Sequence, residues 1–129
     1  MRVYLVRHAE AAPGEPDELR PLTEQGERQS RALGDQLAPR GVTAVRTSPL
    51  LRARQTGDAL ARAAGIASQP DDRLRPGASA EDVRAVAEEC GGVVAVVGHQ
   101  PDCGRIAAEL TGGPEPAFPP AGVVAIELD

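Results

Sequence analysis

Short apolar runs alternate with amphipathic stretches along this chain, and the alternation predicts its secondary structure. Two runs, within residues 2–7 and 93–98, are apolar at almost every position. Uninterrupted apolar runs of this length are typical of strands that a parallel sheet buries on both faces. Further strands are expected near residues 42–47 and 123–128, and residues 66–78 are expected to form mostly loop with a short extended piece.

A helix-start signal precedes each amphipathic stretch. Thr23 can cap a first helix, and Ser48-Pro49 combines an N-cap residue with a proline at the first helical position. Ser79 can cap a third helix, and Pro101 can begin a fourth. Strands that alternate with helices in this way indicate an α/β fold.

Length and composition narrow the class of protein. The 129 residues are expected to form a single domain, spanning residues 1–129, with its own hydrophobic core. In that core, Ala32, Leu33 and Leu37 are expected on the inner face of the first helix. The net charge of −5, with one Phe, one Tyr and no Trp, argues against a general binder of nucleic acid or membrane surfaces.

The chain carries no strong targeting or metal signal. Its first apolar run is four residues long and leads directly into Arg7, which is too short for a signal core or a membrane span, so we expect a cytoplasmic protein. Cys90 and Cys103 suit two reduced thiols. The His99–Cys103 spacing can hold a metal, but a zinc site would need carboxylates to complete it, and we expect neither metal nor cofactor.

The only two histidines follow two of the predicted strands. Arg7-His8 ends the first run, and His99 comes directly after the run at residues 93–98. Open α/β sheets bind ligands just beyond the carboxyl ends of their strands. If both strands belong to one sheet, the two imidazoles share one crevice beside an arginine, which suits chemistry on an anion.

A second arginine strengthens this expectation. Arg52 falls in the first turn of the predicted helix after residues 42–47, where free N–H groups and a partial positive charge favour phosphate. Arg54, in contrast, is expected to be solvated. A histidine or arginine at a strand end is often only a surface residue, but three such features at strand-to-helix junctions together favour a phosphate site.

The chain resembles the histidine phosphatase superfamily, which includes the phosphoglycerate mutases, over nearly its whole length. One further stretch resembles the SixA-type phosphohistidine phosphatases, a subgroup of similarly short chains. The motifs that carry the resemblance are Arg7-His8, Arg20-Pro21-Leu22-Thr23 for the subgroup, Ser48-Pro49 with Arg52 and Gln55-Thr56, and Gly98-His99. It implies a three-layer α/β/α fold with a mainly parallel sheet, no metal, and a covalent phosphohistidine intermediate.

The resemblance also implies roles for individual residues. His8 would attack phosphorus, and neighbouring guanidinium groups would keep its imidazole neutral. Arg7, Arg52 and His99 would bind the phosphoryl group and neutralise its charge. Arg20 would join this pocket or contact the substrate. Ala9 stands where the family signature has Gly, and a small residue is expected to fit there.

The expected substrate is phosphohistidine on a protein. Family members that cleave phosphate esters carry an acid in a segment resembling Leu-x-Glu, and here Leu74-Arg75-Pro76 has none. An imidazole leaving group needs less help from an acid than an alkoxide does. Two alternatives stay open: a small-molecule ester phosphatase and a non-catalytic phosphate-binding module. In the first, the acid would come from a nearby carboxylate: Asp71, Asp72, Glu81 or Asp82.

Overall fold

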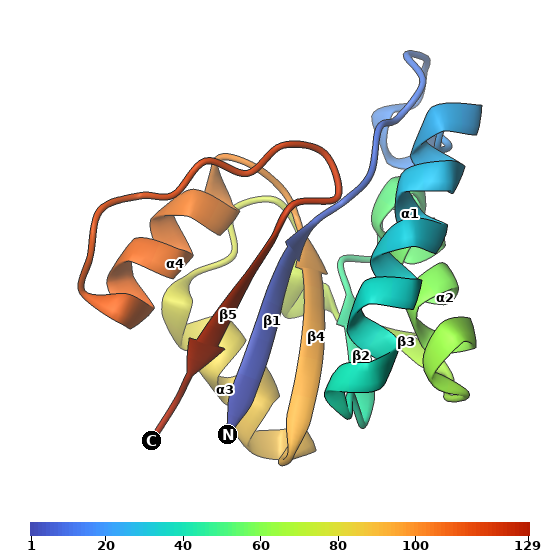
Figure 1. Ribbon diagram of the computed structural model, residues 1–129. Coiled ribbons are helices and arrows are strands. Elements are labelled where there is room, and N and C mark those ends of the chain that lie inside the picture. Colours follow the sequence, from blue (N-terminus) through green and yellow to red (C-terminus); the bar gives the residue numbers. More distant parts are fainter.

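Five strands form one sheet in the order β3-β2-β4-β1-β5 in the computed structural model, which describes residues 1–129 (Figure 1). Strands β3, β2, β4 and β1 are parallel to one another, and β5 pairs with β1 in the antiparallel direction at the edge of the sheet. The strands are β1 (Arg2–Arg7), β2 (Ala44–Thr47), β3 (Ser68–Pro70), β4 (Val93–Gly98) and β5 (Val123–Glu127). A mainly parallel sheet is therefore confirmed.

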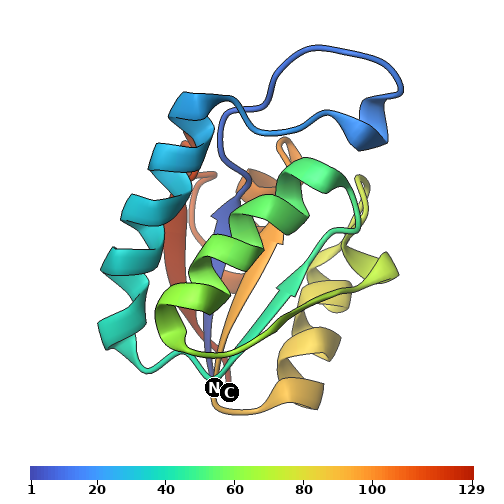
Figure 2. The ribbon, with the colours of Figure 1, turned by 90° about the vertical axis from the view of Figure 1, so that its right-hand side faces the viewer.

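Two helices cover each face of this sheet and complete three layers (Figures 1 and 2). On one face lie α1 (Glu24–Leu37) and α2 (Leu51–Ala64), and on the other lie α3 (Ala80–Cys90) and α4 (Asp102–Thr111). None of the helices combines the length and the apolar character that crossing a membrane requires.

The apolar runs supply side chains to both faces of the sheet. On β1, Val3 and Leu5 join the core beneath α3 and α4, whereas Tyr4 and Val6 join the core beneath α1 and α2. Alternate residues of β4 divide between the two cores in the same way. A strand buried on both faces has no polar positions to alternate, which explains why the first and fourth strands read as continuous apolar runs.

Two of the predicted helix caps form as expected. Thr23 accepts a hydrogen bond from the N–H of Gly26 at the start of α1. Ser79 and Asp82 form a reciprocal capping box at the start of α3. Each satisfies backbone N–H groups that the first helical turn leaves without partners.

The predicted cap at Ser48 is wrong. Helix α2 begins at Leu51, and its N-cap residue, Leu50, makes no side-chain capping bond. The Ser48 hydroxyl instead accepts a hydrogen bond from the N–H of Leu50 at 3.2 Å and contacts His99. Ser48 thus closes a local turn before the helix, and its hydroxyl belongs to the site described below.

The inner face of α1 also differs from the prediction at one position. Ala32 is exposed, while Gly34 is buried beside Leu33. A Cβ at Gly34 would lie 3.0 Å from the Cβ of Ala63 and 3.1 Å from the carbonyl oxygen of Ala59. The glycine therefore allows α1 and α2 to approach closely.

Two short 3₁₀ turns bear on the site. The segment at residues 66–78 contains β3 and the turn η3 (Asp72–Leu74). The loop between β1 and α1 contains the turn η1 (Asp17–Leu19), and it arches over the upper end of α2 in Figure 2. An isolated bridge between Ala11 and Leu22 ties the two arms of this loop together.

Candidate active site

The carboxyl ends of β1 and β4 lie side by side and bring the two histidines together. Arg7 pairs with Gly98 in the parallel ladder, and the N–H of His8 donates to the carbonyl oxygen of Gly98 at 3.0 Å. The imidazole rings of His8 and His99 have centroids 5.2 Å apart and are tilted by 59°. The two predicted strands are therefore neighbours, and their histidines lie side by side.

A backbone carbonyl determines which nitrogen of His8 is free. Its Nδ1 lies 2.7 Å from the carbonyl oxygen of Ala9. Because a carbonyl oxygen can only accept, Nδ1 carries the proton and Nε2 holds the lone pair. Burial, together with the positive charges of Arg52 and Arg7, lowers the pKa of His8 to about 4. At neutral pH the residue is an uncharged imidazole with Nε2 available as a nucleophile.

The residue after His8 is tied to α2. Ala9 is fully buried, and its N–H donates to the hydroxyl of Thr56 at 3.0 Å. The same hydroxyl donates to the carbonyl oxygen of Arg52 at 2.8 Å. The chain at His8 and the first turn of α2 therefore have a fixed relation to each other.

His99 has a different partner. Its side chain is buried, and Nε2 lies 2.7 Å from the hydroxyl oxygen of Ser48. Burial again lowers the pKa to about 4, with the charges of His8 and Arg52 acting in the same direction. Its other nitrogen, Nδ1, is buried and has no hydrogen-bond partner in the protein.

The two predicted phosphate-binding arginines also have donor groups without a hydrogen-bond partner. Arg52 lies in the first turn of α2 and is only 6% exposed. Arg7 donates from Nη1 to the carbonyl oxygen of Phe118 at 2.9 Å. The Nε groups of both arginines are buried without an acceptor, as is Nδ1 of His99. Buried polar groups without a partner are costly unless a ligand or solvent satisfies them, and the two arginine Nε–H donors among these three atoms favour an anion.

Arg20 lies at the margin of this cluster. Its Nε donates to the carbonyl oxygen of Ala12 at 2.8 Å, and its Nη1 pairs with the carboxylate of Asp17 at 3.0 Å. Its charge contributes to the low pKa of His8. The structure thus places Arg20 near the histidines, although its donors are shared with its own loop.

Asp17 is a charged residue of this site that the sequence did not reveal. Its carboxylate pairs with Arg52 Nη2 at 3.2 Å as well as with Arg20, and its carbonyl oxygen accepts from Arg52 Nη1 at 2.9 Å. The spacing of three residues could have indicated the contact with Arg20. No local pattern indicates the contact with Arg52, which lies 35 residues away.

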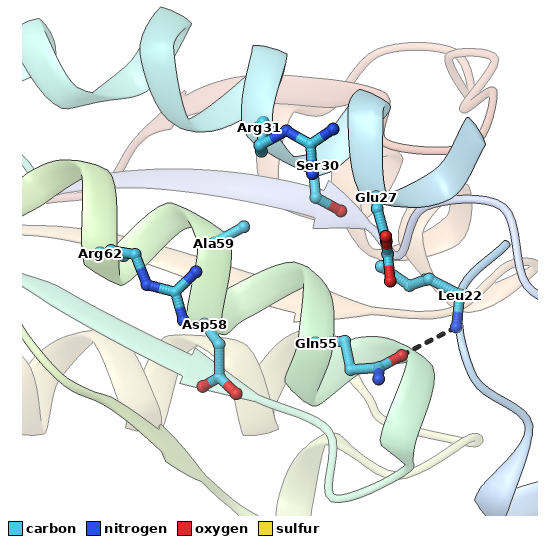
Figure 3. A pocket seen from close by; sticks show the side chains of 8 residues that line it. All are labelled: Leu22, Glu27, Ser30, Arg31, Gln55, Asp58, Ala59 and Arg62. Carbon is cyan, nitrogen blue, oxygen red and sulfur yellow. Dashed lines mark hydrogen bonds between the residues drawn. The ribbon is translucent and has the colours of Figure 1, made fainter. Parts of the chain in front are cut away.

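A glutamine on α2 holds the end of the same loop. Gln55 Oε1 accepts a hydrogen bond from the N–H of Leu22 at 2.8 Å, as the dashed line in Figure 3 marks. The polar groove drawn there, of about 360 Å³, runs between α1 and α2. It is lined by neither histidine and by neither Arg7 nor Arg52, so it lies beside the candidate site.

The four carboxylates considered as a possible general acid are ion-paired, cap a helix or are exposed to solvent. Asp71 pairs with Arg73 at 2.7 Å, and Asp82 caps α3. The side chain of Asp72 is 86% exposed, and Glu81 is exposed. The four carboxylates are thus surface or loop charges and helix-cap residues.

One further carboxylate is buried close to His99. Asp102 accepts from the N–H of Gly77 at 2.7 Å and from Arg105 Nη2 at 2.8 Å. Both of its oxygens are therefore occupied, and they join the 76–77 turn to the start of α4. This residue has a clear structural task and was not singled out from the sequence.

The possible metal pair of His99 and Cys103 has no supporting ligands. No group of three or more His, Cys, Asp or Glu side chains is arranged to hold a metal ion. The Cys103 thiol faces the carbonyl oxygen of Val6 at 3.7 Å, and burial raises its pKa to about 12. Independence from metals and cofactors stays a prediction.

Comparison with known proteins assigns the family. The model of the histidine phosphatase superfamily (branch 1) matches residues 3–77. An uncharacterized protein of Picosynechococcus sp. is 36% identical over 123 residues, which cover 88% of this chain and 74% of that protein. The chain belongs to the histidine phosphatase superfamily.

Within this family, the sequence comparison and the structure comparison point to different members. A Klebsiella pneumoniae protein named probable phosphoglycerate mutase GpmB is 39% identical over 82 residues, but these cover 58% of this chain and only 37% of that relative. The structure of the protein histidine phosphatase SixA complexed with tungstate matches with a TM-score of 0.89 and 29% identity. That match covers 100% of this chain and 89% of the other. The predicted fold and the resemblance to SixA-type proteins are confirmed.

Proposed function

We propose that this chain is a phosphatase that hydrolyses phosphohistidine on a protein, through a covalent phospho-His8 intermediate and without a metal or cofactor. The observation that carries the proposal is the state of His8. It is an uncharged imidazole with its proton held on Nδ1, beside buried arginine donors. These are the requirements for nucleophilic attack on a phosphoryl group.

The first step transfers the phosphoryl group to the enzyme. The lone pair on Nε2 of His8 attacks phosphorus while the P–N bond to the substrate imidazole breaks on the opposite side. The substrate ring carries a proton from solvent on its other nitrogen, so it departs as neutral imidazole and keeps the electron pair of the broken bond. Arg7 and Arg52 neutralise the phosphoryl oxygens, and His99 donates a hydrogen bond to them as negative charge accumulates.

The second step returns the enzyme to its starting state. A water molecule attacks the phosphorus of phospho-His8, the P–Nε2 bond breaks, and inorganic phosphate leaves. His8 recovers its lone pair, and the proton lost by water goes to the phosphate or to solvent. The carbonyl of Ala9 keeps the proton on Nδ1 throughout, so Nε2 stays the reactive atom.

The surroundings of the carboxylates support phosphohistidine over an ester. An alkoxide leaving group needs a proton donor, whereas imidazole, with a conjugate-acid pKa of roughly 6.5, leaves with far less help. Each oxygen of the buried carboxylate Asp102 accepts a hydrogen bond within the protein, and Pro76 stands where family members that cleave esters have an acid. The full-length structural match to SixA points the same way.

The second candidate is a phosphatase for small phosphate esters. The similarity to a relative named as a phosphoglycerate mutase favours it. A non-catalytic phosphate-binding module is the third possibility, and it has no support from the nucleophilic state of His8. The first two candidates share the mechanism and differ only in the leaving group.

The test compares turnover of a phosphohistidine peptide with that of several phosphate esters. Arg52→Gln should lower kcat/KM for the peptide on the order of 10²–10³-fold, as removal of a charge-stabilising donor does. Arg54→Gln is the matched control, because Arg54 is an exposed arginine on the same helix turn. Faster turnover of the esters than of the peptide would contradict the proposed substrate, and binding of phosphate without any turnover would support the binding module.

A further inference from the structure

An exposed negative charge lies next to an arginine of the candidate site. The side chain of Asp17 is 58% exposed, whereas that of its partner Arg52 is 8% exposed. The carboxylate therefore lies on the solvent side of the buried guanidinium. One contact with Arg52 and one with Arg20 hold it there, and the backbone carbonyl of Asp17 accepts a second hydrogen bond from Arg52.

This carboxylate is an anion at neutral pH and has no proton to give. Hydrogen bonds from Arg20 and Arg52 hold the pKa of Asp17 below its usual range. An ionised carboxylate cannot act as the general acid that an ester leaving group needs. Its role must come from its charge and its position.

The position of Asp17 follows from its contact with Arg52, a proposed ligand of the phosphoryl group. In-line attack by His8 places the leaving group on the side of phosphorus away from the imidazole. His8 is only partly buried and follows the carboxyl end of β1, the end of the sheet at which open α/β folds admit ligands from solvent. The exposed carboxylate of Asp17 pairs with Arg52 at 3.2 Å, so a leaving group on the solvent side of the phosphoryl group would lie near it.

We propose that Asp17 selects substrates by the charge of the leaving group: it disfavours phosphate compounds with a second negative charge next to the phosphoryl group and admits those whose leaving group is neutral or cationic. The proposal rests on phosphoryl binding at His8 and Arg52, as in the proposed function. A phosphoglycerate carries such a second charge, whereas the imidazole of phosphohistidine is neutral or positive. The charge of one residue would therefore separate the two substrate classes that the relatives represent.

The expected size of the effect follows from Coulomb's law. Two unit charges about 7 Å apart, in a medium with an effective dielectric constant of about 40 to 80, change a rate or binding ratio roughly threefold to tenfold. The effect should shrink as salt is added, because the carboxylate is exposed.

The experiment uses two ligands that differ by one charge, phenyl phosphate and 4-carboxyphenyl phosphate. Inhibition constants or kcat/KM values are measured for both with the wild-type protein and with Asp17→Asn. We expect the preference for phenyl phosphate to fall roughly threefold to tenfold in the variant. Higher salt should reduce the preference in the wild type and leave the variant unchanged.

Glu18→Gln is the matched control, since Glu18 is the next residue of the same turn, is exposed, and loses the same charge. It should leave the preference unaltered. An equal change for both ligands in Asp17→Asn would overturn the proposal and would mean that Asp17 only positions its arginines. Equal effects of the two variants would overturn it as well. Neither ligand contains phosphohistidine, so failure of the proposed substrate would be seen separately, in the peptide assay.

Discussion

His8 and His99 follow adjacent parallel strands, yet their hydrogen-bond partners differ in kind. His8 faces a backbone carbonyl, which can only accept a proton. His99 faces the hydroxyl of Ser48, which can donate or accept. Both rings are buried enough for their pKa values to fall to about 4. Burial thus lowers both pKa values to a similar extent, and the two histidines differ in the atom to which each is hydrogen-bonded.

The difference suits two separate tasks. A nucleophile must present the same lone pair in every cycle, and a carbonyl partner ensures that it does. A group that stabilises an anion gains from a partner that tolerates a change of protonation, because the approaching phosphoryl charge favours the imidazolium form. We therefore expect changes at the two histidines to have different consequences.

The largest effect is expected from removal of the proposed nucleophile. His8→Ala should abolish the phosphoenzyme and reduce kcat by at least about 10³-fold, since no other group can accept the phosphoryl group. Trapping with a labelled phosphohistidine peptide should yield an acid-labile, alkali-stable phosphoenzyme only where His8 is present. Trapped phosphoenzyme in His8→Ala would contradict the assignment.

Removal of the other histidine should slow the reaction and leave its chemistry intact. His99→Ala should reduce kcat on the order of 10²–10³-fold, the usual effect of losing one transition-state donor. The phosphoenzyme should still form, more slowly, in single-turnover experiments. If His99→Ala behaved like His8→Ala in the trapping assay, the proposed division of roles would be wrong.

The stability of the protein should reveal the two low pKa values. Each histidine has a pKa near 4 in the folded state and near 6.5 when unfolded, so the unfolded state binds more protons between these values. The free energy of unfolding is unaffected above about pH 6.5 and falls as the pH drops to about 4, by up to about 3 kcal/mol per histidine. Denaturant titrations over this range, with His8→Asn/His99→Asn as control, would check it, and equal slopes in both proteins would refute it.

The smallest effect concerns the partner of His99. Ser48→Ala removes the hydroxyl and leaves a buried imidazole nitrogen without its bond, which costs about 1–3 kcal/mol. Applied to the transition state, this corresponds to a loss in kcat of roughly tenfold to a hundredfold. Steady-state assays across pH should show the loss with phosphoenzyme formation retained. An unchanged kcat would mean that the Ser48 contact has no part in the function of His99.

Local patterns were sufficient for much of the fold. The apolar runs at residues 2–7 and 93–98 identified two doubly buried strands, because such strands leave no polar positions. Thr23 and Ser79 marked two helix starts, since capping is a local interaction. The cap at Ser48 failed because its hydroxyl is engaged by a residue 51 positions away.

The candidate site was predictable only in part. The sequence alone was sufficient to predict four residues of the candidate site, because their types and their positions at strand-to-helix junctions are local features. These residues are Arg7, His8, Arg52 and His99. The tertiary structure decided which nitrogen of each histidine is free, how far the pKa values fall, and that Asp17 shields two of the arginines. These features depend on distances between segments far apart along the chain, which no local pattern records.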